Sequence, residues 1–228
     1  MNGQQMGEYY VDIVMCIDAT GSMAPIIDEV KSNAMSFYQR FLDSMEDNDK
    51  EVAQLRIKVI AFRDYGCDAE PMKESKFFTL PDDNEAFKTF VSGIEAQGGG
   101  DAPETALEAI ALALKSDWTT GGSKRRHAIL VFSDAPALPL GARADSPSYP
   151  AGMPKDIAQL GAWWECTDQT LGSTYQAKAG RLIAFVPNAE PWTEISAWNR
   201  YWPAFSPAGT GLEDVDIQSA IDLMVGSF

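Results

Sequence analysis

Three short runs of this chain are apolar almost from end to end, and they constrain its fold more than any other feature. They cover residues 10–17, 128–132 and 182–186. A strand with one face in water alternates apolar and polar residues, so an unbroken apolar run indicates a strand that is covered on both faces. Such strands are typical of parallel sheets, because the crossover helices lie over both faces. The runs therefore predict a parallel sheet at the centre of an α/β fold.

The segments between these runs carry helical patterns. The clearest consists of Ile27, Val30, Ala34, Phe37 and Phe41, whose spacing of three and four places them on one face of a helix. Comparable patterns predict helices over 83–94, 103–114, 155–170, 191–199 and 214–225. Further strands are predicted at 55–62, 77–80 and 204–205.

Strands thus alternate with helices, and no linker divides the chain. We predict a single doubly wound, Rossmann-like α/β domain over residues 9–228, with a mostly parallel central sheet flanked by helices. Residues 1–8 are polar and are predicted to form a flexible tail, and residues 135–154, rich in Pro, Ala and Gly, a long loop.

The charge of the chain narrows the choice of partners. It has 33 acidic and 18 basic residues, a formal net charge of −15, and a single histidine. Such a surface repels a phosphate backbone and an anionic membrane, so neither nucleic acid nor membrane is an expected partner. The three cysteines form no CxxC pair, and the chain has neither a leader-like N-terminus nor a long apolar run. These features predict a soluble cytoplasmic protein.

Oxygen-bearing side chains follow the predicted strands. Asp18, Thr20 and Ser22 come directly after the first apolar run, Asp134 follows the second, and Asp101 follows three glycines. In such a sheet, ligands bind beyond the carboxyl ends of the strands. Carboxylates and hydroxyls are hard donors that suit Mg²⁺ or Mn²⁺, with Ca²⁺ as a third option. The alternative is that these residues cap turns and helices, for which Asp, Thr and Ser are the preferred types.

Three segments together resemble a known family. DIVMCIDATGSM, GGGDAPETALEAI and LVFSDAP resemble the three loops of a von Willebrand factor A (vWA) domain that form its metal-ion-dependent adhesion site, or MIDAS. The resemblance implies that Asp18, Thr20 and Ser22 are first-loop metal ligands and that Asp134 is the third-loop aspartate. AFRDYG at 61–66 is similar to bacterial and alpha-kinase-associated members of this family.

The second loop departs from the family pattern. Where the family has a threonine, this chain has Asp101, and Thr105 is the alternative hydroxyl. Three ionised aspartates around a divalent cation leave a local charge of −1, which favours a neutral or basic partner face. Glu104 lies beside Asp101 and is interpreted as a favourable helix start.

The residues after the second predicted strand are candidates for supporting roles. Arg63, Asp64 and Tyr65 stand where they could contact a partner, and Asp64 could orient a metal-bound water. The alternative for Asp64 is a surface ion pair with Arg63. His127 is expected at the opposite end of its strand, far from this chemistry.

Three functions remain open. The first, which we favour, is a non-enzymatic module that binds a protein partner through Mg²⁺ and selects it with loops 63–68 and 135–154. By family analogy the partner is a kinase or phosphatase in a bacterial cytoplasmic complex. The second is an Mg²⁺-dependent phosphohydrolase or phosphotransferase with Asp18 as nucleophile. The third is a vWA scaffold that binds without metal.

Overall fold

The computed structural model describes residues 8–100, 102–206 and 217–228. Within these ranges the chain forms a seven-stranded sheet in the order β3-β2-β1-β5-β6-β7, with β4 paired to β2 outside this path. The parallel strands are β1 (Tyr9–Asp18), β2 (Val52–Phe62), β5 (Lys124–Phe132), β6 (Gly180–Pro187) and β7 (Tyr201–Ser206). Two short strands, β3 (Met72–Glu74) and β4 (Phe78–Leu80), run antiparallel to β2. The predicted, mostly parallel α/β sheet is confirmed.

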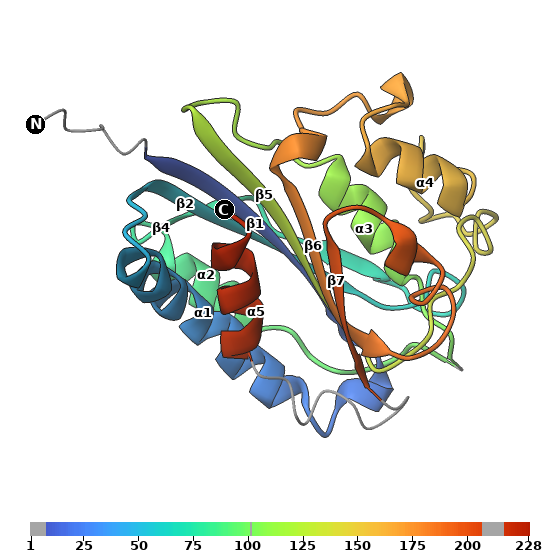
Figure 1. Ribbon diagram of the computed structural model, residues 1–228. Helices are drawn as coiled ribbons and strands as arrows, with labels where there is room; N and C mark the ends of the chain where they lie inside the picture. The colour runs from blue at the N-terminus through green and yellow to red at the C-terminus, as the bar shows by residue number, and fades with distance from the viewer. Residues whose placement is uncertain (1–7, 101, 207–216) are drawn as a thin grey trace, which may run out of the picture.

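Helices cover both faces of the sheet (Figure 1). One layer holds α1 (Ile27–Asp47), α2 (Asn84–Ser92) and α5 (Ile217–Gly226), and the other holds α3 (Ala106–Leu114) and α4 (Ile157–Trp164). The central strand β1 alternates between the layers, because successive side chains of a strand point to opposite faces. From Val11 to Ile17, the odd-numbered side chains pack in the α1 layer, whereas Val14 and Cys16 pack in the α3 layer.

The clearest helical pattern of the sequence, which starts at Ile27, corresponds to α1. All five residues of the predicted stripe, from Ile27 to Phe41, are buried. Phe37 and Phe41 are fully enclosed, and burial of side chains of this size stabilises a fold by about 2–3 kcal/mol each. Among the described helices, none is both long and apolar enough to cross a membrane.

Three predicted helices differ in extent from the observed ones. The helix expected from Pro103 begins at Ala106, because the backbone of Glu104 pairs instead with the segment after β5. The helix expected over 155–170 is α4 followed by a 3-10 turn at Gln169–Leu171. The helix expected over 191–199 is only a 3-10 turn at Ile195–Ala197. The strand at 204–205 extends over all of β7, and residues 1–7 and 214–216, which belong to the predicted tail and last helix, lie outside the described residues.

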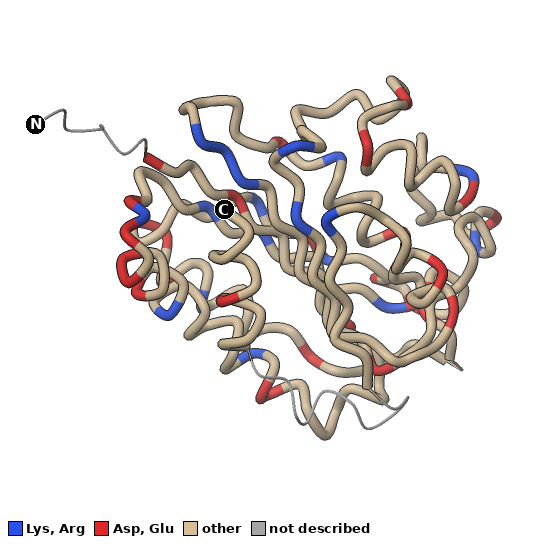
Figure 2. Tube along the Cα trace, viewed as in Figure 1, with Lys and Arg blue, Asp and Glu red and all other residues tan. Residues whose placement is uncertain are grey.

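Basic residues surround the end of α5 at the amino-terminal edge of the parallel strands (Figure 2). The Lys50 ammonium donates to the Val225 carbonyl at 2.5 Å, and the Arg181 guanidinium donates to the Ser227 carbonyl at 2.7 Å. The Arg126 guanidinium lies 5.1 Å from the centre of the Phe228 ring. Cations are favourable at a helix carboxyl end, so these residues anchor α5 to the sheet.

His127 is buried near the same edge, as expected from its place at the start of its strand. Its Nε2 lies 3.1 Å from the Thr119 carbonyl oxygen, and the Gln176 backbone N–H donates to its Nδ1 at 3.3 Å. The ring stacks on Trp118 with centroids 4.9 Å apart. Burial lowers the pKa of His127 to about 4, although nearby Asp12 opposes this. Both nitrogens are therefore satisfied by the neutral ring.

Candidate metal centre

The carboxyl end of β1 places Asp18 at the middle of a hydrogen-bonded group. Asp18 is fully buried, and its Oδ1 accepts from the Thr20 backbone N–H at 2.9 Å and from the Thr20 hydroxyl at 2.6 Å. Its Oδ2 accepts from the Ser133 hydroxyl at 2.6 Å. Parallel strands end at the same edge of a sheet, which is why Ser133, directly after β5, meets the end of β1.

The hydroxyls of the first loop extend this group towards the surface. The Thr20 and Ser22 oxygens lie 3.1 Å apart, and the Ser22 hydroxyl donates to Asp134 Oδ1 at 3.0 Å. A hydroxyl has one hydrogen and two lone pairs, so a hydroxyl that donates to a carboxylate keeps its lone pairs for another ligand. The structure thus brings together four of the predicted site residues, Asp18, Thr20, Ser22 and Asp134.

The environment of Asp18 opposes its negative charge. Burial raises the pKa of Asp18 to about 6, and the neighbouring Asp134 adds to this rise. Hydrogen bonds from Ser133 and Thr20 partly offset it. The charged form of this carboxyl group would therefore be favoured by any positive charge placed beside it.

Glu104 lies beside the candidate site, although the sequence analysis interpreted it as a helix start. The residue is 3% exposed, and its Oε2 atom is buried without a hydrogen-bond partner among the described residues. Burial raises the pKa of Glu104 to about 8, with further contributions from Asp18, Asp64, Asp68 and Asp134. A buried carboxyl group with an unpartnered oxygen is costly unless something binds it. Glu104 is not simply the start of a helix, as its sequence position indicated.

The backbone of Glu104 is held by the segment that follows β5. Its N–H donates to the Pro136 carbonyl at 3.0 Å, and its own carbonyl accepts from the Leu138 N–H at 2.7 Å. These two bonds form a parallel bridge between Glu104 and Ala137. The second and third loops of the site are therefore joined through main-chain hydrogen bonds.

The glycine turn before Glu104 brings its backbone close to the first loop. Gly99 has a φ of +91°, and a Cβ atom there would lie 2.6 Å from the Thr20 Cβ and 3.1 Å from Glu104 Oε1. The Gly98 carbonyl accepts from the Gly21 N–H at 3.0 Å. Only glycine fits so close an approach in this backbone conformation. Asp101, the predicted second-loop ligand, lies outside the described residues.

Thr105 and Arg63 lie beside the group but serve a different purpose. Thr105 is buried, and its hydroxyl donates to the Arg63 carbonyl rather than pointing towards Asp18. The buried Arg63 guanidinium donates to the backbone carbonyls of Ala19, Glu70 and Glu95, at 2.9–3.1 Å. Both side chains therefore tie the loops to the end of β2, and neither joins the Asp18 group.

Asp64 pairs with an arginine distant in sequence. Its Oδ1 and Oδ2 accept from the Nε and Nη2 atoms of Arg143 at 2.8 and 2.7 Å, so the surface pair with Arg63 is not formed. The Asp64 side chain is 1% exposed, whereas that of Arg143 is 37% exposed. Tyr65 is also buried and stacks edge-on against Tyr149 at 5.2 Å. Together these contacts fasten the loop after β5 over the end of β2.

The donor set suits a hard cation, although it is not a closed cage. In the part of the chain that the structure describes, no three His, Cys, Asp or Glu side chains come together as a metal-binding group. Mg²⁺ usually keeps several waters and takes only one or two protein carboxylates. Two hydroxyls with available lone pairs and the Asp18 and Asp134 carboxylates fit that requirement. The unpartnered oxygen of Glu104 is a further acceptor close to the Thr20 side chain.

Three residues in or around the candidate site could hardly be identified from the sequence. Ser133 directly precedes Asp134, and Glu104 directly precedes Thr105, so both stand next to residues that the pattern did identify. Arg143 lies in a long loop, and nothing in its local sequence points to Asp64, 79 positions away. A search one residue to either side of each candidate would have found the first two.

Taken together, the fold and the site define a class of protein. A doubly wound parallel sheet carries linked hydroxyl and carboxylate side chains where β1 and β5 end side by side. Residues 12–140 match the von Willebrand factor A domain family, which is more than half of the chain. The chain belongs to this family, as the sequence resemblance predicts.

Individual relatives are distant. The alpha-protein kinase vwkA of Dictyostelium discoideum is 26% identical over 147 residues, and the match covers 64% of this chain but only 22% of that protein. The pilus adhesin SpaC of Lactobacillus rhamnosus GG, in its open conformation, has a TM-score of 0.55 at 10% identity, over 96% of this chain and 30% of the adhesin. A von Willebrand factor type A protein from Catenulispora acidiphila has a TM-score of 0.55 at 13% identity, over 95% and 43% of the two chains. These structures show a shared fold.

Proposed function

We propose that this domain is a protein-interaction module that binds its partner through a divalent cation, most simply Mg²⁺. Domains of its family commonly bind other proteins, and one similar structure is a pilus adhesin. The cation would be held by the hydroxyls of Thr20 and Ser22 and by the carboxylates of Asp18 and Asp134, with the Glu104 carboxylate as a further acceptor for the cation or its waters. When bound, it would supply positive charge and an open coordination position for an oxygen atom of the partner.

The observation that carries this proposal is the buried, unpartnered Oε2 of Glu104. Burial raises the pKa of Glu104 to about 8, and the carboxylates of Asp18 and Asp134, which accept from hydroxyls that keep their lone pairs, add to this rise. If the aspartate, threonine and serine side chains only capped turns and helices, the buried Glu104 oxygen would still have no partner. A cation accounts for the hydroxyls, the carboxylates and this oxygen together.

The residues around the cluster would prepare the site for the cation. Asp18 accepts the hydroxyl hydrogen of Thr20, and Asp134 accepts that of Ser22, so the oxygen lone pairs of both remain available. Ser133 holds the other oxygen of Asp18 in place. The arrangement is preorganised, which lowers the cost of ordering the site on binding.

We propose a non-enzymatic role because Thr20 stands where a phosphatase with Asp18 as nucleophile would carry the second aspartate of a D-x-D motif. The competing phosphohydrolase hypothesis predicts Mg²⁺-dependent release of p-nitrophenol from p-nitrophenyl phosphate that is lost in Asp18→Asn. We expect no turnover above background in the wild-type protein, and turnover lost in the variant would overturn the non-enzymatic role.

The proposed partner is a protein with a neutral or basic contact face, a kinase or a phosphatase by analogy. The name of the Dictyostelium relative, an alpha-protein kinase, favours a kinase. The three cysteines are free, which suits a reducing compartment, and we propose a cytoplasmic location without a nucleic-acid or membrane partner.

The test is calorimetric titration of Mg²⁺ and Mn²⁺ into the protein. We expect one cation to bind, with at least tenfold weaker affinity in Ser22→Ala and in Glu104→Gln. Ser22 is exposed, so its variant should fold normally, and Glu85→Gln on α2 is a control for loss of one carboxylate. Absence of binding, or equal affinity in all variants, would refute the metal site. If the protein captures its partner equally well in the presence of a chelator, the remaining hypothesis is a vWA scaffold that binds without metal.

A further inference from the structure

A cavity of about 300 Å³ opens between the segment after β5 and the segment after β6. Its lining includes Leu107 of α3, Ala137 and Leu140 after β5, and Ile157 at the start of α4. Ala137 is the residue bridged to Glu104, so the cavity shares a wall with the candidate metal centre. The volume lies at the lower end of the range for ligand pockets, about 300–1,000 Å³.

The floor of this cavity is part of the hydrophobic core. Leu107, Ala137 and Leu140 are 1%, 6% and 8% exposed, and all three belong to the core layer that contains α3 and α4. The Trp192 indole N–H donates to the Ala135 carbonyl at 3.1 Å, which fastens the two walls together. The floor is therefore apolar and fixed in place before anything binds.

The rim of the cavity is acidic. Asp156, Glu190 and Glu194 are exposed and line the opening, and none of the described lysines or arginines lines it. Among the described residues, none of the three carboxylates has a salt-bridge partner. Their hydrogen bonds come from backbone N–H groups, of Gln159 to Asp156 and of Glu194 to Glu190. Three unpaired negative charges around an apolar floor complement a cationic, apolar ligand.

We propose that this cavity binds a partner peptide in which a large apolar side chain is flanked by lysine or arginine. The apolar side chain enters the cavity, and the flanking cations meet Glu190, Glu194 and Asp156. This inference rests on the proposed role as a protein-interaction module, but it does not depend on the cation. It assigns partner selection to the loops that follow β5 and β6.

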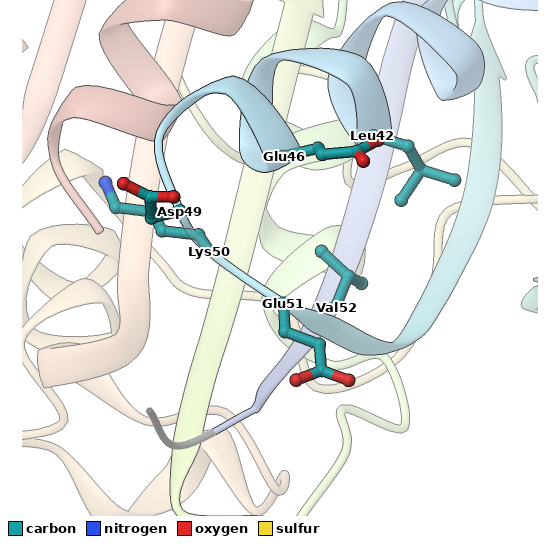
Figure 3. Close-up of a pocket in the computed structure, with 6 residues that line it drawn as sticks. All are labelled: Leu42, Glu46, Asp49, Lys50, Glu51 and Val52. Carbon is teal, nitrogen blue, oxygen red and sulfur yellow. The ribbon is translucent and has the colours of Figure 1, made fainter. Parts of the chain in front are cut away.

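A second hollow offers a matched control. It has a volume of about 420 Å³ and lies where α1 turns into β2, lined by Leu42, Glu46, Asp49, Lys50, Glu51 and Val52 (Figure 3). Its carboxylates share the lining with the Lys50 ammonium, and it has fewer apolar side chains than the cavity beside Ala137. Replacing Glu46 and Glu51 by glutamine removes the same charge as replacing Glu190 and Glu194, away from the proposed site.

The experiment is an NMR titration of the ¹⁵N-labelled protein with the peptide Gly-Ser-Lys-Leu-Lys-Ser-Gly, in a chelator and at low salt. We expect saturable shifts that include the Trp192 indole signal. Two comparison peptides, with serine in place of leucine or with glutamate in place of both lysines, should bind at least fivefold more weakly. The Glu190→Gln/Glu194→Gln protein should bind the lysine peptide about fivefold more weakly. The Glu46→Gln/Glu51→Gln protein should bind it as the wild type does.

Equal binding of the three peptides, shifts located elsewhere, or equal loss in both double variants would overturn the cavity proposal. Because the chelator removes divalent cations, the result is separate from the metal titration. If the peptide binds but the calorimetric titration detects no cation binding, the metal site alone is refuted. If a cation binds but the peptide does not, the cavity proposal alone is refuted.

Discussion

The single histidine of this chain allows a sharp test of the packing at the amino-terminal edge of the sheet. Lowering the pH from 7.5 to 5 would protonate an ordinary histidine, but His127 has a pKa lowered to about 4 by burial. Protonation would force Nδ1 to carry a hydrogen, and the hydrogen bond from Gln176 would be lost. The ring should therefore remain neutral at pH 5 while the protein stays folded.

The free-energy consequence follows from the two pKa values. An unfolded chain takes up a proton on His127 near pH 6.5, whereas the folded protein takes it up only near 4. Because the folded-state pKa is the lower one, the stabilisation by the neutral ring is complete above pH 6.5 and is lost as the pH falls towards 4. The loss should reach about 2 kcal/mol at pH 5 and roughly 3 kcal/mol at its limit.

Two measurements check this prediction. With one histidine, a carbon-detected or ¹H–¹³C NMR titration gives its pKa directly from a single imidazole signal. Urea unfolding of the wild-type protein and His127→Gln should show that the stability difference between them shrinks by about 2 kcal/mol from pH 7.5 to pH 5. The variant lacks the titrating ring but keeps every carboxyl group. The pH dependence of stability that the carboxyl groups cause therefore cancels in the comparison. An imidazole pKa of 6 or above would refute the burial argument.

Three further predictions concern the site and its loops. Gly99→Ala should lower the free energy of unfolding by roughly 1–3 kcal/mol, because φ is +91° and the new Cβ meets Thr20; urea unfolding would show it, and an unchanged midpoint would contradict it. Arg143→Ala should cost roughly 1–3 kcal/mol by leaving the buried Asp64 without its cation, and Asp64→Asn in the same chain should restore part of that loss. A thiol reagent should modify the two exposed cysteines quickly and Cys16 only on unfolding, since burial raises the pKa of Cys16; rapid modification of all three thiols would contradict the fold.

Local patterns were sufficient to predict the central sheet and the long helix. The core strands are buried on both faces, so an unbroken apolar run in the sequence is enough to predict a strand at the centre of the sheet. The short strand β3 has no such signal, because Met72–Glu74 is only three residues long and depends on pairing with β2. The predicted helix over 191–199 failed for a related reason. Trp192 and Ile195 are buried, but they pack into the core from turns rather than from one face of a helix.

The site was predictable only where its residues follow strand ends. Asp18, Thr20, Ser22 and Asp134 form one hydrogen-bonded group, as their places after β1 and β5 indicated. Partners distant in sequence were not predictable in this way. The pairing of Arg143 with Asp64 depends on the path of the whole loop after β5. The unpartnered oxygen of Glu104 became apparent only when its burial and its neighbours were known.

The main-chain bridge between Glu104 and the segment 136–138 has a thermodynamic consequence. One end of this bridge carries a carboxylate of the candidate metal centre, and the other forms a wall of the cavity that we propose for the peptide. Any shift of Glu104 on cation binding would therefore reshape the cavity. Linkage then requires reciprocity: the factor by which Mg²⁺ changes the affinity for a peptide equals the factor by which that peptide changes the affinity for Mg²⁺. Measuring both factors on one sample would give the coupling free energy of the two sites.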